Sequence, residues 1–215
     1  MAYLVFDAGG TFTKFALMNE KTDILERGKF NTPDYTSGTK EEFISMISEV
    51  IERYKDRSEG IAFSMPGMLD SDAGYCVTAG YLAYLCGTPL AQILSEKHKI
   101  PVTIENDGKC AALAEFWKGS LKGCTNGAVL ILGSGVGGGL IIDKKLYKGG
   151  RQTAGEFSYV MVDENQKYEL DGYWGMKSGF QGLAKRTAFY TREDWESYDG
   201  LKLFERAAAG DDMVL

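Results

Sequence analysis

The chain has 215 residues, a length that suits one large domain or two modest ones. Apolar residues make up 44% of it, which is enough for a hydrophobic core and argues against disorder. The formal net charge of −6, with Lys and Arg scattered along the chain, argues against a nucleic-acid-binding surface. No apolar run approaches the roughly 20 residues of a membrane span, and the start "MAYLVFDAGG" lacks the features of a signal peptide. A cytoplasmic protein without membrane or nucleic-acid partners is expected.

Strand and helix patterns alternate along most of the chain. The segments with strand-like apolar runs are 3–8, 13–20, 24–32 (as an edge strand), 60–65, 100–107, 126–132 and 140–147. The segments with helical periodicity are 39–55, 88–99, 108–120, 182–191 and 200–210. Thr39 and Glu42 have the spacing of a capping box at the start of the first helix. This alternation predicts an α/β fold.

Two strand–turn–strand units recur, one beginning near Leu4 and the other near Val129. Each has an apolar strand, a turn of small residues and a second apolar strand. Such a duplication predicts two related α/β domains that face one another across a cleft. The expected boundary divides the chain into residues 1–118 and residues 119–215.

The first turn combines a carboxylate, glycines and hydroxyls. Glycine turns expose backbone N–H groups and let an anion approach closely. The candidate phosphate-binding residues are Gly9, Gly10, Thr11, Thr13 and Lys14. Asp7 beside a phosphate implies a cation between them, and Mg²⁺ takes such a carboxylate directly or through water. The alternative is an ordinary β-hairpin, since Asp and Gly are common turn residues.

The second turn, "GSGVGGG", supplies a further set of candidates, namely Gly133, Ser134, Gly135, Gly137 and Gly138. Its spacing formally matches GxGxxG, but a dinucleotide fold needs a helix next, and "LIIDKKLY" is typical of a strand. The chain has no GxxxxGK[ST] sequence, which excludes a P-loop. Two glycine turns on opposing domains are instead expected to hold one phosphate chain from both sides.

The segment "IENDGKCAALAE" ends a strand with Asn106 and Asp107 and then begins a helix. Ligands gather at the carboxyl ends of strands in α/β sheets. Asp107 is therefore a candidate base that accepts a proton from a hydroxyl attacking a phosphoryl group. The alternative is that Asp107 only caps the helix.

The four cysteines, Cys76, Cys86, Cys110 and Cys124, are widely spaced, and His98 is the one histidine. Metal sites built from Cys and His need clustered ligands. The cysteines are therefore expected to be small buried apolar residues in a reducing compartment.

Taken together, "FDAGGTFTK", "SMPG", "ENDGKCAALAE", "LGSGVGGGLIID" and "TAGEF" resemble, in order and spacing, the ROK family (repressors, unassigned reading frames and sugar kinases). The resemblance covers essentially the whole chain. It implies a two-lobed actin-like, or ribonuclease H-like, ATPase fold with mixed sheets. It also implies that ATP, with Mg²⁺, and a small-molecule sugar bind in the interlobe cleft.

The resemblance also implies roles for individual residues. "DAGGT" and "GSGVGG" match the two phosphate motifs of the family. Asp107 falls on the catalytic base, which deprotonates the sugar hydroxyl that attacks the γ-phosphate. Asn106 and Glu156 fall on ligands of the sugar hydroxyls, and Gly67 falls beside the sugar.

The sequence departs from the family pattern at three places. Tyr159 stands where a histidine of the zinc-containing members would be, and it either replaces a contact to the sugar or belongs to the core. Residues 168–182 contain no cysteine, so no zinc site is expected. Lys109 stands where a small amide is common, with a surface lysine as the alternative interpretation.

The chain is also shorter than family members usually are, and it ends at "GDDMVL" in what is expected to be mid-helix. An incomplete second lobe is therefore expected, without the glycine motif that holds adenosine or the helix that returns to the first lobe. The first phosphate motif begins at Asp7, which leaves no room for the DNA-binding segment of the family's repressors.

The leading hypothesis is an ATP-dependent kinase of a hexose or hexose glycoside, with a homodimer as one expected assembly. A catalytically inactive sugar-binding or regulatory remnant is the alternative from another class. An activator ATPase or acetate-kinase-like enzyme fits less well, because Asn106 and Glu156 match sugar ligands. Glucose, a β-glucoside, mannose, fructose and N-acetylmannosamine all remain open as the sugar.

Overall fold

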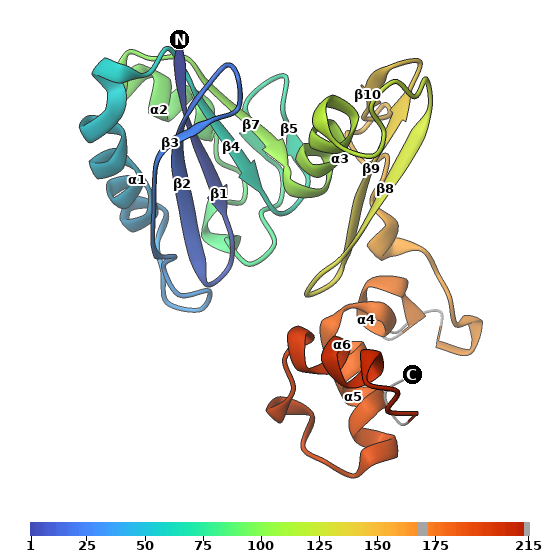
Figure 1. Cartoon of the computed structure of the whole chain (residues 1–215). Coiled ribbons are helices and arrows are strands. Elements are labelled where there is room, and N and C mark those ends of the chain that lie inside the picture. The colour runs from blue at the N-terminus through green and yellow to red at the C-terminus, as the bar shows by residue number, and fades with distance from the viewer. Residues whose placement is uncertain (167–171, 213–215) are drawn as a thin grey trace. The chain divides into compact units, whose positions relative to one another are not determined.

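The computed structural model describes residues 1–166 and 172–212 (Figure 1). Contacts divide the chain into two compact units, each described here by itself. The first unit comprises Met1–Cys110 and Lys148–Thr153, and the second comprises Ala111–Tyr147 and Ala154–Leu215. The boundary expected after residue 118 falls at the end of helix α3 (Asp107–Lys118), whereas the contacts divide that helix after its first turn.

The first unit is built on a five-stranded mixed sheet. Its strands, in sheet order, are β3 (Ile24–Asn31), β2 (Phe12–Asn19), β1 (Ala2–Ala8), β4 (Ile61–Met65) and β7 (Val102–Asn106). The first three pair antiparallel, whereas β1, β4 and β7 run parallel. The predicted strands are confirmed, and β3 is an edge strand as expected.

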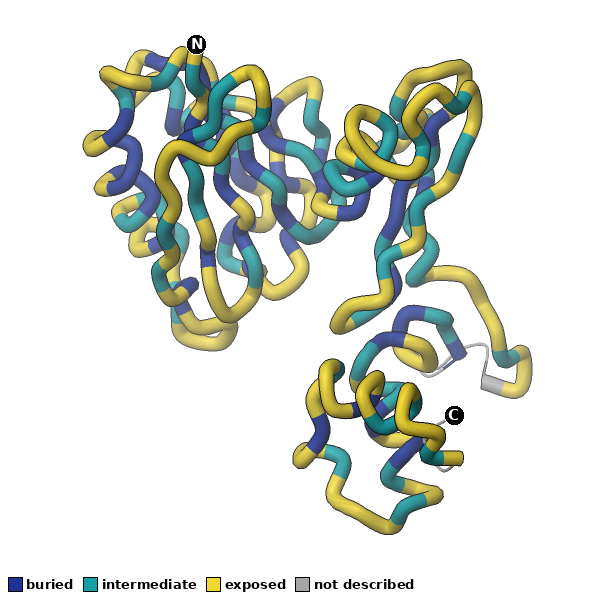
Figure 2. The backbone as a smooth tube through the Cα atoms, in the orientation of Figure 1, coloured by how far each residue is buried: buried dark blue, intermediate teal, exposed yellow. Residues whose placement is uncertain are grey.

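One face of this sheet forms the main core with α1 (Lys40–Tyr54) and α2 (Leu90–His98) (Figures 1 and 2). Alternation along β1 buries Leu4, Phe6 and Ala8 on this side. The rings of Phe6 and Phe63 stack with centroids 4.6 Å apart. Burying one such side chain stabilises the fold by about 1.5–3 kcal/mol.

Polar contacts hold the two helices in place. The Thr39 hydroxyl accepts a hydrogen bond from the Glu42 N–H at 3.1 Å, as the predicted capping box requires. His98 is buried, and its ring nitrogens lie 2.7 Å from Glu52 Oε1 and 3.0 Å from Ser48 Oγ. The single histidine therefore connects α2 to α1.

A hairpin and short helical turns complete the first unit. Their bounds are β5 (Leu69–Asp70), β6 (Tyr75–Cys76), and the 3₁₀ turns η1 (Lys55–Arg57) and η2 (Ala83–Leu85). A bridge between Cys76 and Thr88 then leads the chain toward α2. The segment after β6 also lies beside Gly67, because the Thr78 N–H donates to the Met68 carbonyl at 3.0 Å.

The second unit begins within α3 (Asp107–Lys118) and contains the antiparallel sheet β10-β9-β8. Its strands are β8 (Gly127–Leu132), β9 (Val136–Ile142) and β10 (Lys145–Tyr147). The later elements are η3 (Phe157–Tyr159), η4 (Glu164–Gln166), α4 (Trp174–Ser178), α5 (Phe180–Thr191), η6 (Trp195–Ser197) and α6 (Gly200–Ala208). Ala184, Tyr198 and Leu203 form a small core between the last helices.

All four cysteines are free thiols. Cys76 is fully buried, Cys110 and Cys124 are partly buried, and Cys86 is exposed. The expectation that all four are buried is therefore wrong for Cys86, which follows a 3₁₀ turn on the surface. Within the described ranges, no helix has the length and apolar character needed to cross a bilayer.

Candidate functional site

The carboxyl ends of three parallel strands carry the candidate residues of the first unit. The sheet register pairs Asp7 of β1 with Ser64 of β4, and Ser64 with Glu105 of β7. Paired residues of adjacent strands point to the same face, so these three side chains form one row. Asn106 and Asp107 follow directly, at the junction of β7 and α3.

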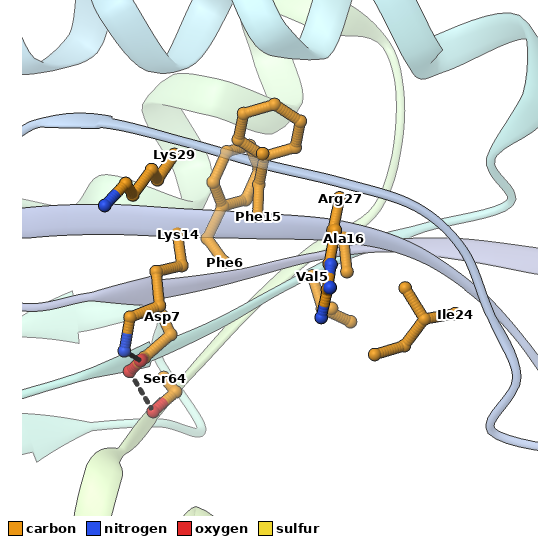
Figure 3. A pocket seen from close by; sticks show the side chains of 11 residues that line it. Val5, Phe6, Asp7, Lys14, Phe15, Ala16, Ile24, Arg27, Lys29 and Ser64 are labelled. Carbon is orange, nitrogen blue, oxygen red and sulfur yellow. Dashed lines mark hydrogen bonds and ion pairs between the residues drawn. The ribbon is translucent and has the colours of Figure 1, made fainter.

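Asp7 lies between a cation and a hydroxyl in this row. Lys14 Nζ donates to its Oδ2 at 3.4 Å, and Ser64 Oγ donates to its Oδ1 at 3.5 Å (Figure 3). The Asp7 and Lys14 side chains are 57% and 66% exposed, so solvent screens their attraction. Both groups thus remain accessible to a charged ligand.

The first glycine turn connects β1 to β2. The Gly9 N–H donates to the Phe12 carbonyl at 3.1 Å, while Gly10 and Thr11 are exposed. Thr13 is fully buried, and its hydroxyl lies 2.9 Å from that of Thr32. The Thr32 hydroxyl in turn donates to the Gly9 carbonyl at 2.7 Å. Thr13 therefore stabilises the turn from inside, and does not face a ligand as the sequence-based prediction held.

Asn106 is buried and held at three atoms. Its N–H donates to Glu105 Oε1 at 2.9 Å, and its Oδ1 accepts the Lys109 N–H at 3.1 Å. Its Nδ2 donates to the Gly67 carbonyl at 3.0 Å. Asn106 therefore acts as the cap of α3, and one Nδ2 hydrogen and one Oδ1 lone pair remain for a ligand.

Asp107 occupies the first position of α3 and is exposed. The Gly108 N–H donates to its Oδ1 at 2.8 Å. Because Asn106 accepts the capping bond from the Lys109 N–H, the alternative in which Asp107 only caps the helix is not needed. Lys109 is 1% exposed, so a surface lysine at this position is wrong.

Gly67 requires a backbone conformation that favours glycine. Its φ is +97°, and a Cβ there would lie 2.6 Å from the Thr78 carbonyl oxygen. The glycine therefore lets the segment after β6 approach the chain closely. Its own carbonyl oxygen, in turn, orients the Asn106 amide.

Lys148 and Glu105 form an ion pair that supports this arrangement. Lys148 Nζ lies 2.9 Å from Glu105 Oε2 and 3.7 Å from Asp72 Oδ1, and their side chains are 26%, 16% and 82% exposed. Burial lowers the pKa of Lys148, but the hydrogen bond and charge of Glu105 and the charge of Asp72 outweigh it and raise the pKa overall. The pair anchors residues 148–153 in the first unit and fixes the carboxylate that accepts the Asn106 N–H.

Lys148→Met is expected to destabilise the first unit by roughly 1–3 kcal/mol, because it leaves the partly buried Glu105 carboxylate without its cation. Urea unfolding measures the loss. The double variant Glu105→Gln/Lys148→Met is the control, since it removes both charges and should recover part of the loss. If the double variant lost as much stability as the two single variants together, the two charges would not be coupled.

The carboxylates at this edge of the sheet influence the pKa of the Cys110 thiol. Burial, together with the charges of Glu105, Asp107 and Asp7, raises the pKa of its thiol to about 12, although a hydrogen bond with Ser64 acts in the opposite direction. Three carboxylates therefore direct negative potential to one edge of the sheet.

In the described part of the chain, three or more His, Cys, Asp or Glu side chains do not group into a metal site. Mg²⁺ needs only one or two carboxylates beside water and phosphate oxygens, so an exposed Asp7 fits that ion.

The second glycine turn joins β8 to β9 in the second unit. The Gly133 N–H donates to the Gly135 carbonyl at 2.9 Å, and the Gly133 carbonyl accepts the Phe180 N–H at 2.7 Å. Gly133 and Ser134 are exposed. The turn thus presents accessible backbone next to the start of α5.

Gly137 and Gly138 lie within β9, not in the turn. Gly138 is buried, and a Cβ there would lie 2.2 Å from the Val129 carbonyl oxygen and 2.6 Å from the Phe157 ring. Gly138 is therefore a packing position and does not offer its backbone to a ligand, contrary to the prediction made for it.

Glu156 and Tyr159 lie on the segment that follows Gly155. Gly155 has a φ of +83°, and a Cβ there would lie 2.8 Å from Gly139 Cα, so this segment packs closely on β9. Tyr159 is 71% exposed, with its ring edge-on to Tyr173 at 6.4 Å. Tyr159 is therefore not a core residue, and the other interpretation, in which it replaces a contact to the sugar, stays a prediction.

The structure brings Asp7, Asn106, Asp107, Gly67 and the first glycine turn together within the first unit. It brings the second glycine turn, Glu156 and Tyr159 together within the second. Sequence reasoning missed Ser64, Glu105 and Lys148. The alternation of "IAFSM" and "VTIEN" could have identified the first two, because it directs Ser64 and Glu105 to the same side of their strands.

Comparison with protein families and curated proteins gives consistent results. The ROK family model matches residues 3–214. The beta-glucoside kinase of Klebsiella pneumoniae is 29% identical over 216 residues, which cover 98% of this chain and 70% of that protein. The N-acetyl-D-glucosamine kinase of Vibrio cholerae is 34% identical over 173 residues, which cover 78% of this chain and 55% of that protein.

Solved structures agree in fold. A ROK family protein from Streptococcus pneumoniae in complex with sucrose has a TM-score of 0.83 and 26% identity, and the match covers 100% of this chain and 70% of that one. A ROK family glucokinase from Streptomyces griseus, in complex with glucose and AMPPNP, has a TM-score of 0.83 and 24% identity over 100% of this chain and 73% of that one. The actin-like ATPase fold expected from the sequence is confirmed. The chain belongs to the ROK family.

Proposed function

We propose that this chain carries the sugar-binding and catalytic residues of an ATP-dependent sugar kinase that phosphorylates a hydroxyl of a hexose or hexose glycoside. The observation that carries the proposal is the position of Asp107. It is an exposed carboxylate directly after the immobilised amide of Asn106, on the sheet edge that also holds Asp7. Relatives named as kinases of β-glucosides and N-acetyl-D-glucosamine support the same reaction class.

In the proposed reaction, Asp107 accepts the proton of the sugar hydroxyl as its oxygen attacks the γ-phosphorus of ATP. The bond from that phosphorus to the β–γ bridging oxygen breaks, so the products are a sugar phosphate and ADP. In the first unit, Asn106 and the backbone near Gly67 are the candidates for binding sugar hydroxyls, and Glu156 and Tyr159 are the candidates in the second unit.

Backbone N–H groups of each glycine turn, and Lys14 in the first unit, are the candidate phosphate ligands. The candidate donors are Gly10 and Thr11 in the first turn and Ser134 and Gly135 in the second, since the N–H groups of Gly9 and Gly133 donate within their own turns. Asp7 would hold Mg²⁺ directly or through water, and the ion would neutralise charge on the phosphate oxygens. Lys14, which contacts Asp7 at 3.4 Å, has the reach to interact with either group.

Coupled measurement of ADP release over a panel of hexoses and glycosides tests the proposal. We expect sugar-dependent release with at least one member of the panel. Because the chain spans about 70% of the length of the beta-glucoside kinase, a version extended to that length should be measured beside it. Sugar binding without ADP release from either version would favour a sugar-binding protein instead of a kinase.

A further inference from the structure

Two exposed tyrosines lie beside the first glycine turn. Tyr35 belongs to the loop after β3, and Tyr81 belongs to the segment after β6. They are 56% and 54% exposed, and their ring centroids lie 6.2 Å apart at an interplanar angle of 74°. The pair is thus an edge-to-face aromatic contact whose remaining ring surface faces solvent.

Close backbone contacts place Tyr81 between the two parts of the first-unit site. A Cβ on Gly10 would lie 2.9 Å from Tyr81 Cβ, so Tyr81 adjoins the phosphate turn. A Cβ on Gly80 would lie 3.1 Å from Pro66 Cβ, so the residue before Tyr81 adjoins the Pro66–Gly67 turn. The Gly67 carbonyl accepts the Asn106 amide at 3.0 Å. The aromatic pair therefore borders the residues assigned to the sugar.

The loop of Tyr35 is held by a network around Asp34. Asp34 Oδ1 accepts the N–H groups of Thr36 and Ser37 at 3.0 and 3.1 Å, and their hydroxyls at 2.6 and 3.0 Å. The hydroxyl and N–H of Thr36, followed by those of Ser37, lower the pKa of Asp34 to about 2. The Gly38 N–H also donates to the Asp34 carbonyl at 2.7 Å. The backbone that carries Tyr35 is therefore held before any ligand binds, which reduces the entropy lost on binding.

Tyr81 is fixed by its neighbours as well. Gly80 has a φ of +52°, and the Leu82 N–H donates to the Ala79 carbonyl at 2.8 Å, with both Ala79 and Leu82 fully buried. The Tyr81 side chain thus projects from an anchored turn. Two aromatic rings with phenolic hydroxyls, carried on anchored turns, match the chemistry of a carbohydrate ring, which has an apolar C–H face and a hydroxyl rim.

From this arrangement we propose that Tyr35 and Tyr81 form a subsite for the second ring of a glycoside or disaccharide substrate. The proposal rests on the proposed sugar kinase function, since the first ring is the one held by Asn106. It makes a hexoside, whose aglycone ring reaches the tyrosines, a better substrate than the free hexose. An adenine ring on the same tyrosines is the competing occupant that the test must exclude.

Calorimetric titration with glucose, phenyl glucoside and cellobiose tests this subsite. The chain should bind at least one glucoside on the order of 10-fold more tightly than glucose, the upper range expected for a stacked aromatic contact. Tyr81→Ala and Tyr35→Ala should each remove most of that advantage and leave the glucose affinity within about 2-fold of the original. Tyr81→Phe should retain most of it, since the ring remains.

Tyr147→Ala is the matched control, because Tyr147 is 51% exposed on β10, within the second unit. Equal affinity for glucose and both glucosides, or alanine variants that bind glucosides normally, would overturn the subsite and leave the kinase assignment standing. If the chain bound neither glucose nor the glucosides, the proposed sugar site itself would be wrong. Adenosine affinity that falls in Tyr35→Ala and Tyr81→Ala, with glucoside affinity unchanged, would assign the pair to the nucleotide and overturn the proposal.

Discussion

Asp107→Asn is expected to lower the rate of sugar phosphorylation by about 10²–10⁴-fold, the range that a positioned general base contributes. Asparagine keeps the size of the side chain and the oxygen that accepts the Gly108 N–H at 2.8 Å. It cannot take a proton from a hydroxyl at neutral pH. The loss should therefore fall on kcat, while the dissociation constant of the sugar stays within a few-fold.

The measurement is ADP release under saturating sugar and ATP, beside calorimetric titration of the sugar, on the shortest version of the chain that turns over. Glu115→Gln is the control, because it replaces a carboxylate by its amide on the same helix. An Asp107→Asn variant with a near-normal kcat would remove Asp107 as the base. An equal fall in the Glu115→Gln variant would indicate a general effect on α3.

Gly67→Ala is expected to have the largest effect on the folded state, about 2–4 kcal/mol in the free energy of unfolding. A Cβ at a φ of +97° is strained, and it would also lie 2.6 Å from the Thr78 carbonyl and 2.7 Å from Ala79 Cα. Relief requires a shift of the Gly67 backbone, whose carbonyl holds the Asn106 amide. Sugar affinity should therefore fall together with stability.

Gly87→Ala is the control that introduces backbone strain without a steric clash. Gly87 also has a positive φ, of +73°, but the nearest atom to its added Cβ is the Tyr75 hydroxyl at 3.6 Å. Urea unfolding of this variant should show a loss of only about 1 kcal/mol and an unchanged sugar affinity. Matching losses in the two variants would mean that the contact between Gly67 and the segment after β6 has no special role.

The five sheet strands and the two long helices of the first unit could be predicted because each satisfies a local rule, whereas the hairpin of β5 and β6 was not predicted. Alternation marks β1, apolar spacing marks α1, and the Thr39 cap begins that helix where the sequence places it. Local rules also identified the glycine turns, because a turn in which backbone segments approach closely is rich in glycine.

Contacts between residues that are distant in the sequence could not be predicted from such local rules. Nothing in the sequence near Lys148 indicates that Glu105 is its partner, because the pairing depends on how residues 148–153 return to the first unit. The burial of Thr13 depends likewise on the neighbouring Thr32. The types of the candidate site residues could be recognised from their chemistry. The directions in which their side chains point depend on strand register and packing.

The segment Lys148–Thr153 belongs to the first unit, although the stretches on both sides of it belong to the second. The polypeptide therefore passes from one unit to the other between residues 110 and 111, 147 and 148, and 153 and 154. A single nick in the backbone cannot release either body from the other. Expressing either unit alone would likewise require excision and rejoining of the coding sequence at more than one place.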